Sequence, residues 1–213
     1  MSVDRRPRRS RRTLAWGVSA IVIVGLLAIL RPWTVVPIET TTARAFDAES
    51  YVASVWASRV LPTAERVAVD LQSFVQEQTT GVAGAVPARR AVFVKGTATV
   101  AEVDRVSRIG LARLRLPWAK NGQAAAIQIG PVLRGTALRD ALDFIQFTDF
   151  VNQLEFASVA NALNDRVIRD VLGAVDVETL AGRDVTFLGA VPVPVGSTLE
   201  IVPVRLQVSG GAK

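Results

Sequence analysis

The sequence predicts an α+β fold, and three features of the chain indicate it. Apolar residues recur at helical spacing up to about residue 80, and the period changes to that of β-strands beyond residue 90. Three predicted strands, one long helix and two further strands then follow in that order. This order is typical of a five-stranded OB-like β-barrel in which the helix joins strands three and four. A small α+β sandwich with one helix on an open antiparallel sheet is the competing arrangement.

The N-terminal residues predict a transmembrane signal anchor. Residues 1–12 carry six arginines and one aspartate, and residues 14–30 are apolar and uncharged. At the helical rise, the apolar run spans about 25 Å, the lower end of what crosses a bilayer core. Basic segments beside a span stay in the cytoplasm. Residues 1–12 are therefore a predicted cytoplasmic tail, residues 13–31 a single-pass anchor in a bacterial cytoplasmic membrane, and the body is extracytoplasmic.

A cleavable secretory signal is the alternative to this anchor. Cleavage needs small residues directly after the apolar run, where Arg31, Pro32 and Trp33 stand instead. Trp16 and Trp33 lie near the two ends of the run, as interfacial aromatic residues do. The sequence thus favours an uncleaved anchor. The stretch Ser10–Leu14 is similar to the start of a twin-arginine export signal, so export by that route or by general secretion stays open.

The segment after the anchor predicts a tether and then two helices. Residues 32–46 are rich in threonine and contain two prolines, which is typical of an extended linker. Asp47 is placed to cap a helix over residues 48–60, and Pro62 suits the first turn of a second helix. Residues 47–80 are therefore expected to form a helical hairpin or a single kinked helix.

The remaining domain, residues 90–208, is expected to form the OB-like barrel, because β-branched and aliphatic residues concentrate in five segments. The predicted strands cover residues 91–103, 106–116, 124–129, 184–193 and 198–208. Thr136 is expected to cap a short turn, and a helix capped at Thr148 or Asp149 is expected to run to Gly173. The expected inward face of that helix comprises Phe150, Leu154, Ala157, Leu163, Val167 and Val171.

The charge of the chain is unevenly distributed. The formal net charge is +6, but residues 1–12 contribute +5 of it and the body only +1. A protein that binds nucleic acid carries its positive charge on the folded domain. The distribution therefore predicts no nucleic-acid partner and a tail that contacts anionic lipid.

The absence of histidine and cysteine restricts the chemistry of the chain. It excludes Ser-His-Asp and Cys-His catalysis, disulfides, and the usual zinc and haem ligands. No metal and no cofactor is predicted. A carboxylate-dependent hydrolase using Asp140, Asp149 or Glu155 is the remaining enzymatic alternative, but no motif pairs these groups. The sequence therefore favours a protein that is not an enzyme.

One stretch of the chain concentrates hydrogen-bonding side chains around the predicted junction between strand three and the long helix. Such groups can form a surface that binds a small polar ligand or a partner loop. The structural alternative is that they satisfy the backbone of the adjoining Gly-rich loop. Under either interpretation, residues 134–140 are expected to converge with Asn152 and Gln153 where strand three leads into the long helix. The candidates are Arg134, Thr136, Arg139, Asp140, Asn152, Gln153, Asn161 and Asn164.

Four phenylalanines lie in the same stretch of sequence. OB-type domains bind bases and sugars through exposed rings, which is one interpretation of this cluster. The apolar residues that flank the rings favour core packing instead. The four residues are Phe144, Phe147, Phe150 and Phe156.

The runs Ile127–Ala141, Phe147–Ala157 and Val159–Asn164 resemble the signature of a bacterial family called domain of unknown function 2291. The similarity spans residues 46–208 and includes further matches at Tyr51, Trp56, Pro62, Val94–Gly96, Gly182–Gly189 and Pro203–Val204. The resemblance implies a predicted periplasmic lipoprotein, often encoded beside sugar ABC-transporter genes and without an established activity. This chain departs from many relatives because it lacks a lipobox cysteine, so a protein anchor stands in place of a lipid one.

Two functional hypotheses follow. The first is a membrane-anchored, non-enzymatic accessory or scaffolding protein with an envelope partner such as a sugar-transporter component. The second is a module that binds a solute or saccharide on the OB-like barrel face, as some OB folds do.

Overall fold

A computed structural model describes residues 46–80, 90–119 and 123–209. The predicted cytoplasmic tail, anchor and all but the last residue of the tether lie outside these described residues. Within the described ranges, none of the helices combines the length and the apolar character that a membrane crossing requires.

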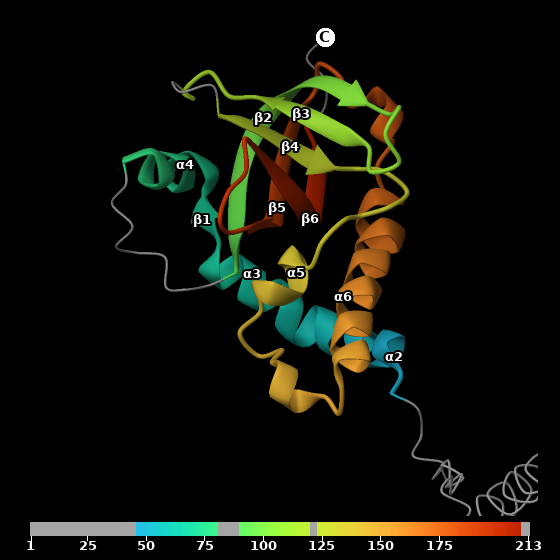
Figure 1. The fold of residues 1–213 in the computed structure, drawn as a ribbon. Coiled ribbons are helices and arrows are strands. Elements are labelled where there is room, and N and C mark those ends of the chain that lie inside the picture. The colour runs from blue at the N-terminus through green and yellow to red at the C-terminus, as the bar shows by residue number, and fades with distance from the viewer. Residues whose placement is uncertain (1–45, 81–89, 120–122, 210–213) are drawn as a thin grey trace, which may run out of the picture. The chain divides into compact units, whose positions relative to one another are not determined.

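The described part is an α+β fold built on a six-stranded sheet (Figure 1). Its strands are β1 (Val69–Asp70), β2 (Ala91–Asp104), β3 (Leu111–Arg115), β4 (Ala124–Gln128), β5 (Asp184–Pro192) and β6 (Thr198–Val208). The order is β1-β2-β3-β4-β6-β5, and β5 also pairs with β2. The pairings β2-β3-β4-β6-β5-β2 therefore form a closed ring. Within this ring only β4 and β6 are parallel, whereas the short β1 adds to β2 in parallel.

The length of β2 allows the strand pairings to close. Its first part, Ala91–Thr99, pairs with β5, and its second part, Thr99–Asp104, pairs with β3. A register shift between Val100 and Glu102 marks an irregularity in the second part. Bulges of this kind bend a strand and increase its twist, which lets one strand contribute to two sides of a strongly curved sheet.

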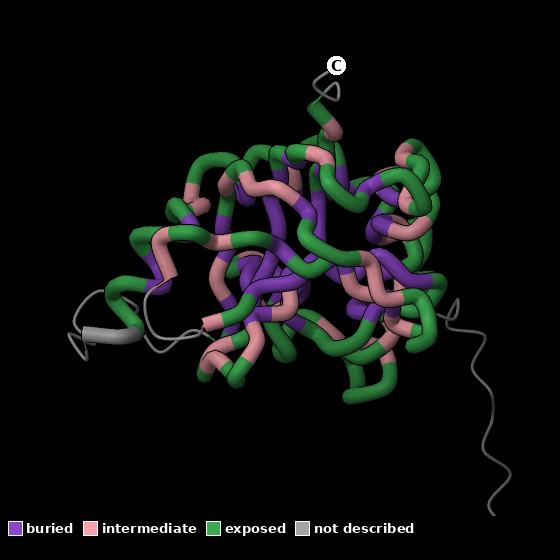
Figure 2. The backbone as a smooth tube through the Cα atoms, turned by 90° about the horizontal axis from the view of Figure 1, so that it is seen from above, coloured by how far each residue is buried: buried purple, intermediate pink, exposed green. Residues whose placement is uncertain are grey.

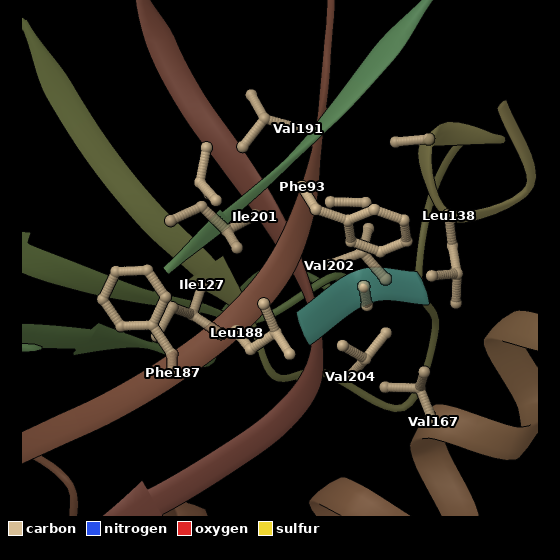
Figure 3. Close-up of a cluster of buried hydrophobic side chains, with 14 of the residues drawn as sticks. Phe93, Ile127, Leu138, Val167, Phe187, Leu188, Val191, Ile201, Val202 and Val204 are labelled. Carbon is tan, nitrogen blue, oxygen red and sulfur yellow. The ribbon is translucent and has the colours of Figure 1, made fainter. Parts of the chain in front are cut away.

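The core fills the space between the strands and the helices that cover one end of them (Figure 3). Phe93, Phe187 and Ile201 come from three different strands and are fully buried. Leu138 of the short helix α5 (Ala137–Asp140) and Val167 of the long helix α6 (Gln153–Val167) complete this cluster. Figure 2 shows the same distribution, with buried residues in the strands and exposed residues in the loops around them.

The N-terminal helices do not divide at Pro62, where a second helix was predicted to begin. Helix α2 (Ala48–Val55) continues through a π-helical turn, η1 (Trp56–Val60), directly into α3 (Leu61–Val67). The chain breaks at β1 instead, before α4 (Leu71–Thr80). Proline lacks an N–H, and a wide π turn directly before it accommodates that loss without ending the helix.

The predicted N-cap of the first helix is confirmed, and the predicted N-cap of the long helix α6 is wrong. The carboxylate of Asp47 accepts hydrogen bonds from the backbone N–H groups of Glu49 and Ser50, as expected of an N-cap. The cap of α6 is Asn152, whose Oδ1 accepts from Glu155 N at 2.9 Å. Thr148 and Asp149 belong instead to a separate 3₁₀ turn, η2 (Phe147–Asp149).

The buried face of α6 also differs from the predicted one. Leu163 and Val167 are buried as expected, with Phe150 and Val171 half-buried, but Leu154 and Ala157 are exposed. Leu154 precedes Leu163 by nine residues, which at about 100° per residue places it on the opposite side of the helix. The buried stripe is Val159, Ala160, Leu163, Asn164 and Val167.

The end of the helical run agrees with the prediction. Helix α6 passes into a π turn, η3 (Ile168–Leu172), and Gly173 is its C-cap. A further 3₁₀ turn, η4 (Val177–Thr179), leads to β5.

Candidate functional site

The strongest polar contacts of the candidate residues surround the guanidinium of Arg139, which is only 7% exposed. Its Nε and Nη2 donate to Asp140 Oδ1 at 2.9 and 2.7 Å, and its Nη1 donates to the Phe156 carbonyl at 3.1 Å. The Thr136 hydroxyl donates to Asp140 Oδ2 at 2.7 Å. Both carboxylate oxygens of Asp140 are therefore occupied, and the cluster joins α5 to α6.

The ring of Phe156 completes the environment of Arg139. The guanidinium carbon lies 3.7 Å from the ring centroid, a cation–π contact in a largely desolvated position. A buried charge is tolerated only where a partner and hydrogen bonds replace water. All of these partners are present here, which makes Arg139 a structural residue of the α5–α6 junction.

Two amides hold the loop that leads from β4 to α5. Asn164 Nδ2 donates to the Gly135 carbonyl at 3.1 Å, and Gln128 Oε1 accepts from Arg134 N at 2.8 Å. Gly135 has φ +91°, which favours glycine. Within the described part of the chain, no buried side-chain nitrogen or oxygen lacks a hydrogen-bond partner. Of the predicted amides, Asn164 therefore satisfies the loop backbone as the structural alternative expected, and Gln128, which was not predicted, does the same.

Gly130 of the same loop is required by a close approach of two backbones. A Cβ there would lie 2.0 Å from the Ile109 carbonyl oxygen. Gly110, with φ +55°, faces Gly130 across this contact. Two backbone hydrogen bonds, Gly130 N to Ile109 O and Ile129 N to Gly110 O, join the segments. The close packing of these two backbones therefore explains the glycine at position 130 of the family signature.

A second polar cluster lies between β4 and β6. Arg134 Nη2 donates to both oxygens of Glu200, at 2.9 and 3.1 Å, and Gln128 Nε2 donates to Glu200 Oε2 at 3.0 Å. Sequence analysis missed Gln128 and Glu200. The available signal was a single polar residue between two apolar neighbours, at position 128 between Ile127 and Ile129 and at position 200 between Leu199 and Ile201.

A pocket of about 360 Å³ opens beside this second cluster. Its charged lining consists of two guanidinium groups, Arg90 and Arg134, and two carboxylates, Asp140 and Glu200. The charges balance, so the pocket is lined by donors and acceptors without a net charge. Gln128, Thr136 and Thr198 add further polar groups.

The other three candidates do not join either cluster. Among the described residues, no hydrogen bond links the side chains of Asn152, Gln153 or Asn161 to the segment 134–140, so the convergence expected of Asn152 and Gln153 with that segment is wrong. All three side chains are exposed, and Asn152 acts as the helix cap. The predicted set thus divides into five residues that converge near α5 and three on the surface of α6.

The carboxylates considered for hydrolysis have separate local roles. Asp140 binds Arg139 and Thr136, Asp149 Oδ2 accepts from Gln146 N at 3.0 Å, and Glu155 Oε2 accepts from Val151 N at 3.1 Å. No cluster of three acidic groups that could hold a metal ion occurs in the described ranges.

Five aromatic rings, from residues 46 and 51 and from the segment 147–156, form a continuous cluster where the described chain begins. Phe150 contacts Phe46, Tyr51 and Phe156, with ring centroids 5.4 to 5.8 Å apart. Phe147 meets the edge of Phe156 at 5.6 Å. These distances are typical of favourable aromatic pairs.

The segment that contributes Phe147 and Phe150 to this cluster also carries exposed apolar side chains, which together we call the apolar patch. It consists of Phe147, Val151 and Leu154, which are 54%, 89% and 81% exposed. The prediction that all four phenylalanines pack in the core is therefore wrong for Phe147. Single exposed apolar residues are ordinary, but three within eight positions on ordered aromatic packing form a candidate contact surface.

Tyr51, in the aromatic cluster, has a raised pKa. Burial disfavours the tyrosinate and raises the pKa of Tyr51, the positive charge of Arg59 lowers it, and the carboxylate of Asp149 raises it further. The pKa of the Tyr51 phenol is therefore sensitive to the charges of Arg59 and Asp149 near the apolar patch.

Comparison with known proteins agrees with this architecture. A solved OB-fold protein from Thermotoga maritima is similar to this chain, with a TM-score of 0.59 and 16% sequence identity over 78% of this chain and 100% of that one. At this identity the likeness shows the fold alone, which is of the OB type. No curated protein matches the chain.

The family is shown by the sequence itself. The profile of the predicted periplasmic lipoproteins named domain of unknown function 2291 matches residues 20–207, so the chain belongs to that family. This confirms the resemblance seen in the signature, and the family's description indicates an extracytoplasmic, envelope-associated protein.

Replacing Arg139 should test the structural role of the first cluster. Arg139→Ala leaves the Asp140 carboxylate and the Phe156 carbonyl without their donor, so we expect the free energy of unfolding to fall by about 3 kcal/mol. The matched control is Arg105→Ala, which removes an exposed ion pair with Glu178 and should cost less than about 1 kcal/mol. Chemical denaturation measures both, and equal losses would contradict this assignment.

The pKa of Tyr51 gives an independent test. Tyr51 is the single tyrosine of the chain, so near-UV absorbance follows its ionisation alone. We expect Asp149→Asn to lower the pKa and Arg59→Gln to raise it. Because the pKa of the folded state exceeds the unfolded value of about 10, the stability contribution is complete below that value and is lost as pH rises through the folded pKa. Shifts in the opposite directions would contradict this environment.

Proposed function

We propose that this chain is a membrane-anchored, non-enzymatic accessory or scaffolding protein that binds another protein of the bacterial envelope. The observation that carries the proposal is the apolar patch of Phe147, Val151 and Leu154. Large exposed apolar groups on an ordered support are typical of protein-binding surfaces. An anchored body with such a surface can hold a partner at the membrane without acting on it chemically.

Membership of the periplasmic family and the predicted anchor support the location. Residues 1–12 as a cytoplasmic tail and residues 13–31 as a span would leave the body outside the cytoplasm. The family resemblance supports a component of a sugar ABC transporter as the partner. Neither the charge of the body nor its polar motif supports nucleic acid as a ligand.

Site-specific cross-linking in intact envelopes tests this function. A photoreactive amino acid at Val151, in the apolar patch, should form an adduct with an envelope protein, for which a sugar-transporter component is the expected identity. The matched control is Val106, a fully exposed valine outside the patch, where no such adduct should form. The absence of an adduct at Val151, or equal adducts at both positions, would contradict the proposal.

A second candidate function is supported by the pocket beside Glu200. A lining with balanced charge and many donors and acceptors suits an uncharged polyhydroxylated solute, such as a saccharide. Arg134, Gln128 and Glu200 are held by their mutual hydrogen bonds, so they would meet the ligand already oriented.

A thermal-shift screen with sugars tests the pocket. A ligand at 100 times its Kd should add about 2.7 kcal/mol to the free energy of unfolding. Glu200→Gln should abolish this gain, whereas Glu65→Gln, which also removes an ion-paired carboxylate but lies outside the pocket, should keep it. If no sugar raises the melting temperature, the second candidate is wrong.

A further inference from the structure

The segment that carries the apolar patch is acidic. Residues 143–155 include Asp143, Asp149 and Glu155 and contain no lysine or arginine. Glu49 lies in the first turn of α2, and the neighbouring rings of Phe46 and Tyr51 pack on Phe150. Four carboxylates therefore accompany the aromatic cluster and the segment that carries the apolar patch.

Three arginines of the described residues contact this region. Arg59 lies over the ring of Phe144 at 3.9 Å, and Arg169 pairs with Glu49 at 3.0 Å. Arg139 is buried and neutralised by Asp140. Carboxylates therefore predominate on the segment that carries the apolar patch, although the body as a whole is nearly neutral.

The exposed apolar groups are also held in place before any partner arrives. Phe147 packs on the edge of Phe156, whose other contacts include the guanidinium of Arg139 and the ring of Phe150. The turn that carries Val151 is held by its hydrogen bond to Glu155 and by the Asn152 cap. A preorganised surface of this kind loses little conformational entropy on binding.

We propose that the apolar patch and its acidic surroundings bind a segment of another protein that presents apolar side chains flanked by lysine or arginine. The inference rests on the proposed accessory function and adds the chemistry of its partner. The apolar groups would supply the burial, and the carboxylates would select for basic flanks and speed association. The same negative charge disfavours an anionic lipid surface as the occupant, because like charges repel across the contact.

A peptide-selection experiment tests this chemistry on the full-length protein in nanodiscs of uncharged lipid. A phage-displayed library of random peptides is the probe. We expect enrichment of peptides that combine apolar residues with lysine or arginine, and binding that weakens as salt is raised. Leu154→Asp should weaken the selected peptides at least tenfold, whereas Val106→Asp, at a fully exposed valine elsewhere, should not change their affinity.

A second variant keeps the apolar groups and changes only the charge. Asp143→Lys should weaken basic peptides at least threefold and leave uncharged apolar peptides unaffected. Enrichment of acidic peptides, no enrichment, self-association that Leu154→Asp abolishes, or preferential binding to anionic vesicles would each overturn the inference. Failure of this inference is distinguishable from failure of the accessory function. If an envelope partner cross-links at Val151 but its contacting segment lacks basic residues, the accessory function stands and only the selection for basic flanks is wrong.

Discussion

The buried guanidinium of Arg139 is the interaction on which the arrangement of this molecule depends. It bonds to Asp140 beside it in α5, to the carbonyl of Phe156 in α6, and lies over the Phe156 ring. A desolvated cation is costly unless every such partner is present, so its position fixes theirs. Through Phe156, the same contact supports the rings of Phe147 and Phe150 and thus the exposed surface above them.

The signature stretch therefore has two different faces. Some of its polar residues turn inward, where Gln128 and Asn164 satisfy the loop between β4 and α5 and Arg139 bonds to the backbone of α6. Some of its apolar residues turn outward, as Val151 and Leu154 do. Much of the polar motif that could be interpreted as a binding surface therefore supports the apolar patch from within the molecule. In the pocket beside Glu200, polar groups of the motif line an open space.

Much of the fold could be predicted because its signals are local. Strands β2, β4, β5 and β6 follow from their residue periods, and Asp47 and Gly173 mark the start and the end of helical runs. The predicted strand 106–116 is shortened to β3, and β1 lies in a segment that was predicted to be helical. The start of α6 could not be chosen from sequence, because Thr148, Asp149 and Asn152 are all good caps and tertiary packing decides among them. Glu200 lies 66 residues from Arg134, a pairing that only the strand order of the folded chain brings about. The exposure of Phe147 depends likewise on where α6 begins.

Hydrogen exchange in Arg139→Lys tests most directly whether this contact holds the surface. Lysine keeps the charge but loses the forked donors that reach Asp140 and Phe156 together. We predict faster backbone exchange across residues 143–156, with β2, β5 and β6 unchanged. Exchange in that segment equal to that of the unmodified protein would contradict the account, and so would an increase spread evenly over the strands.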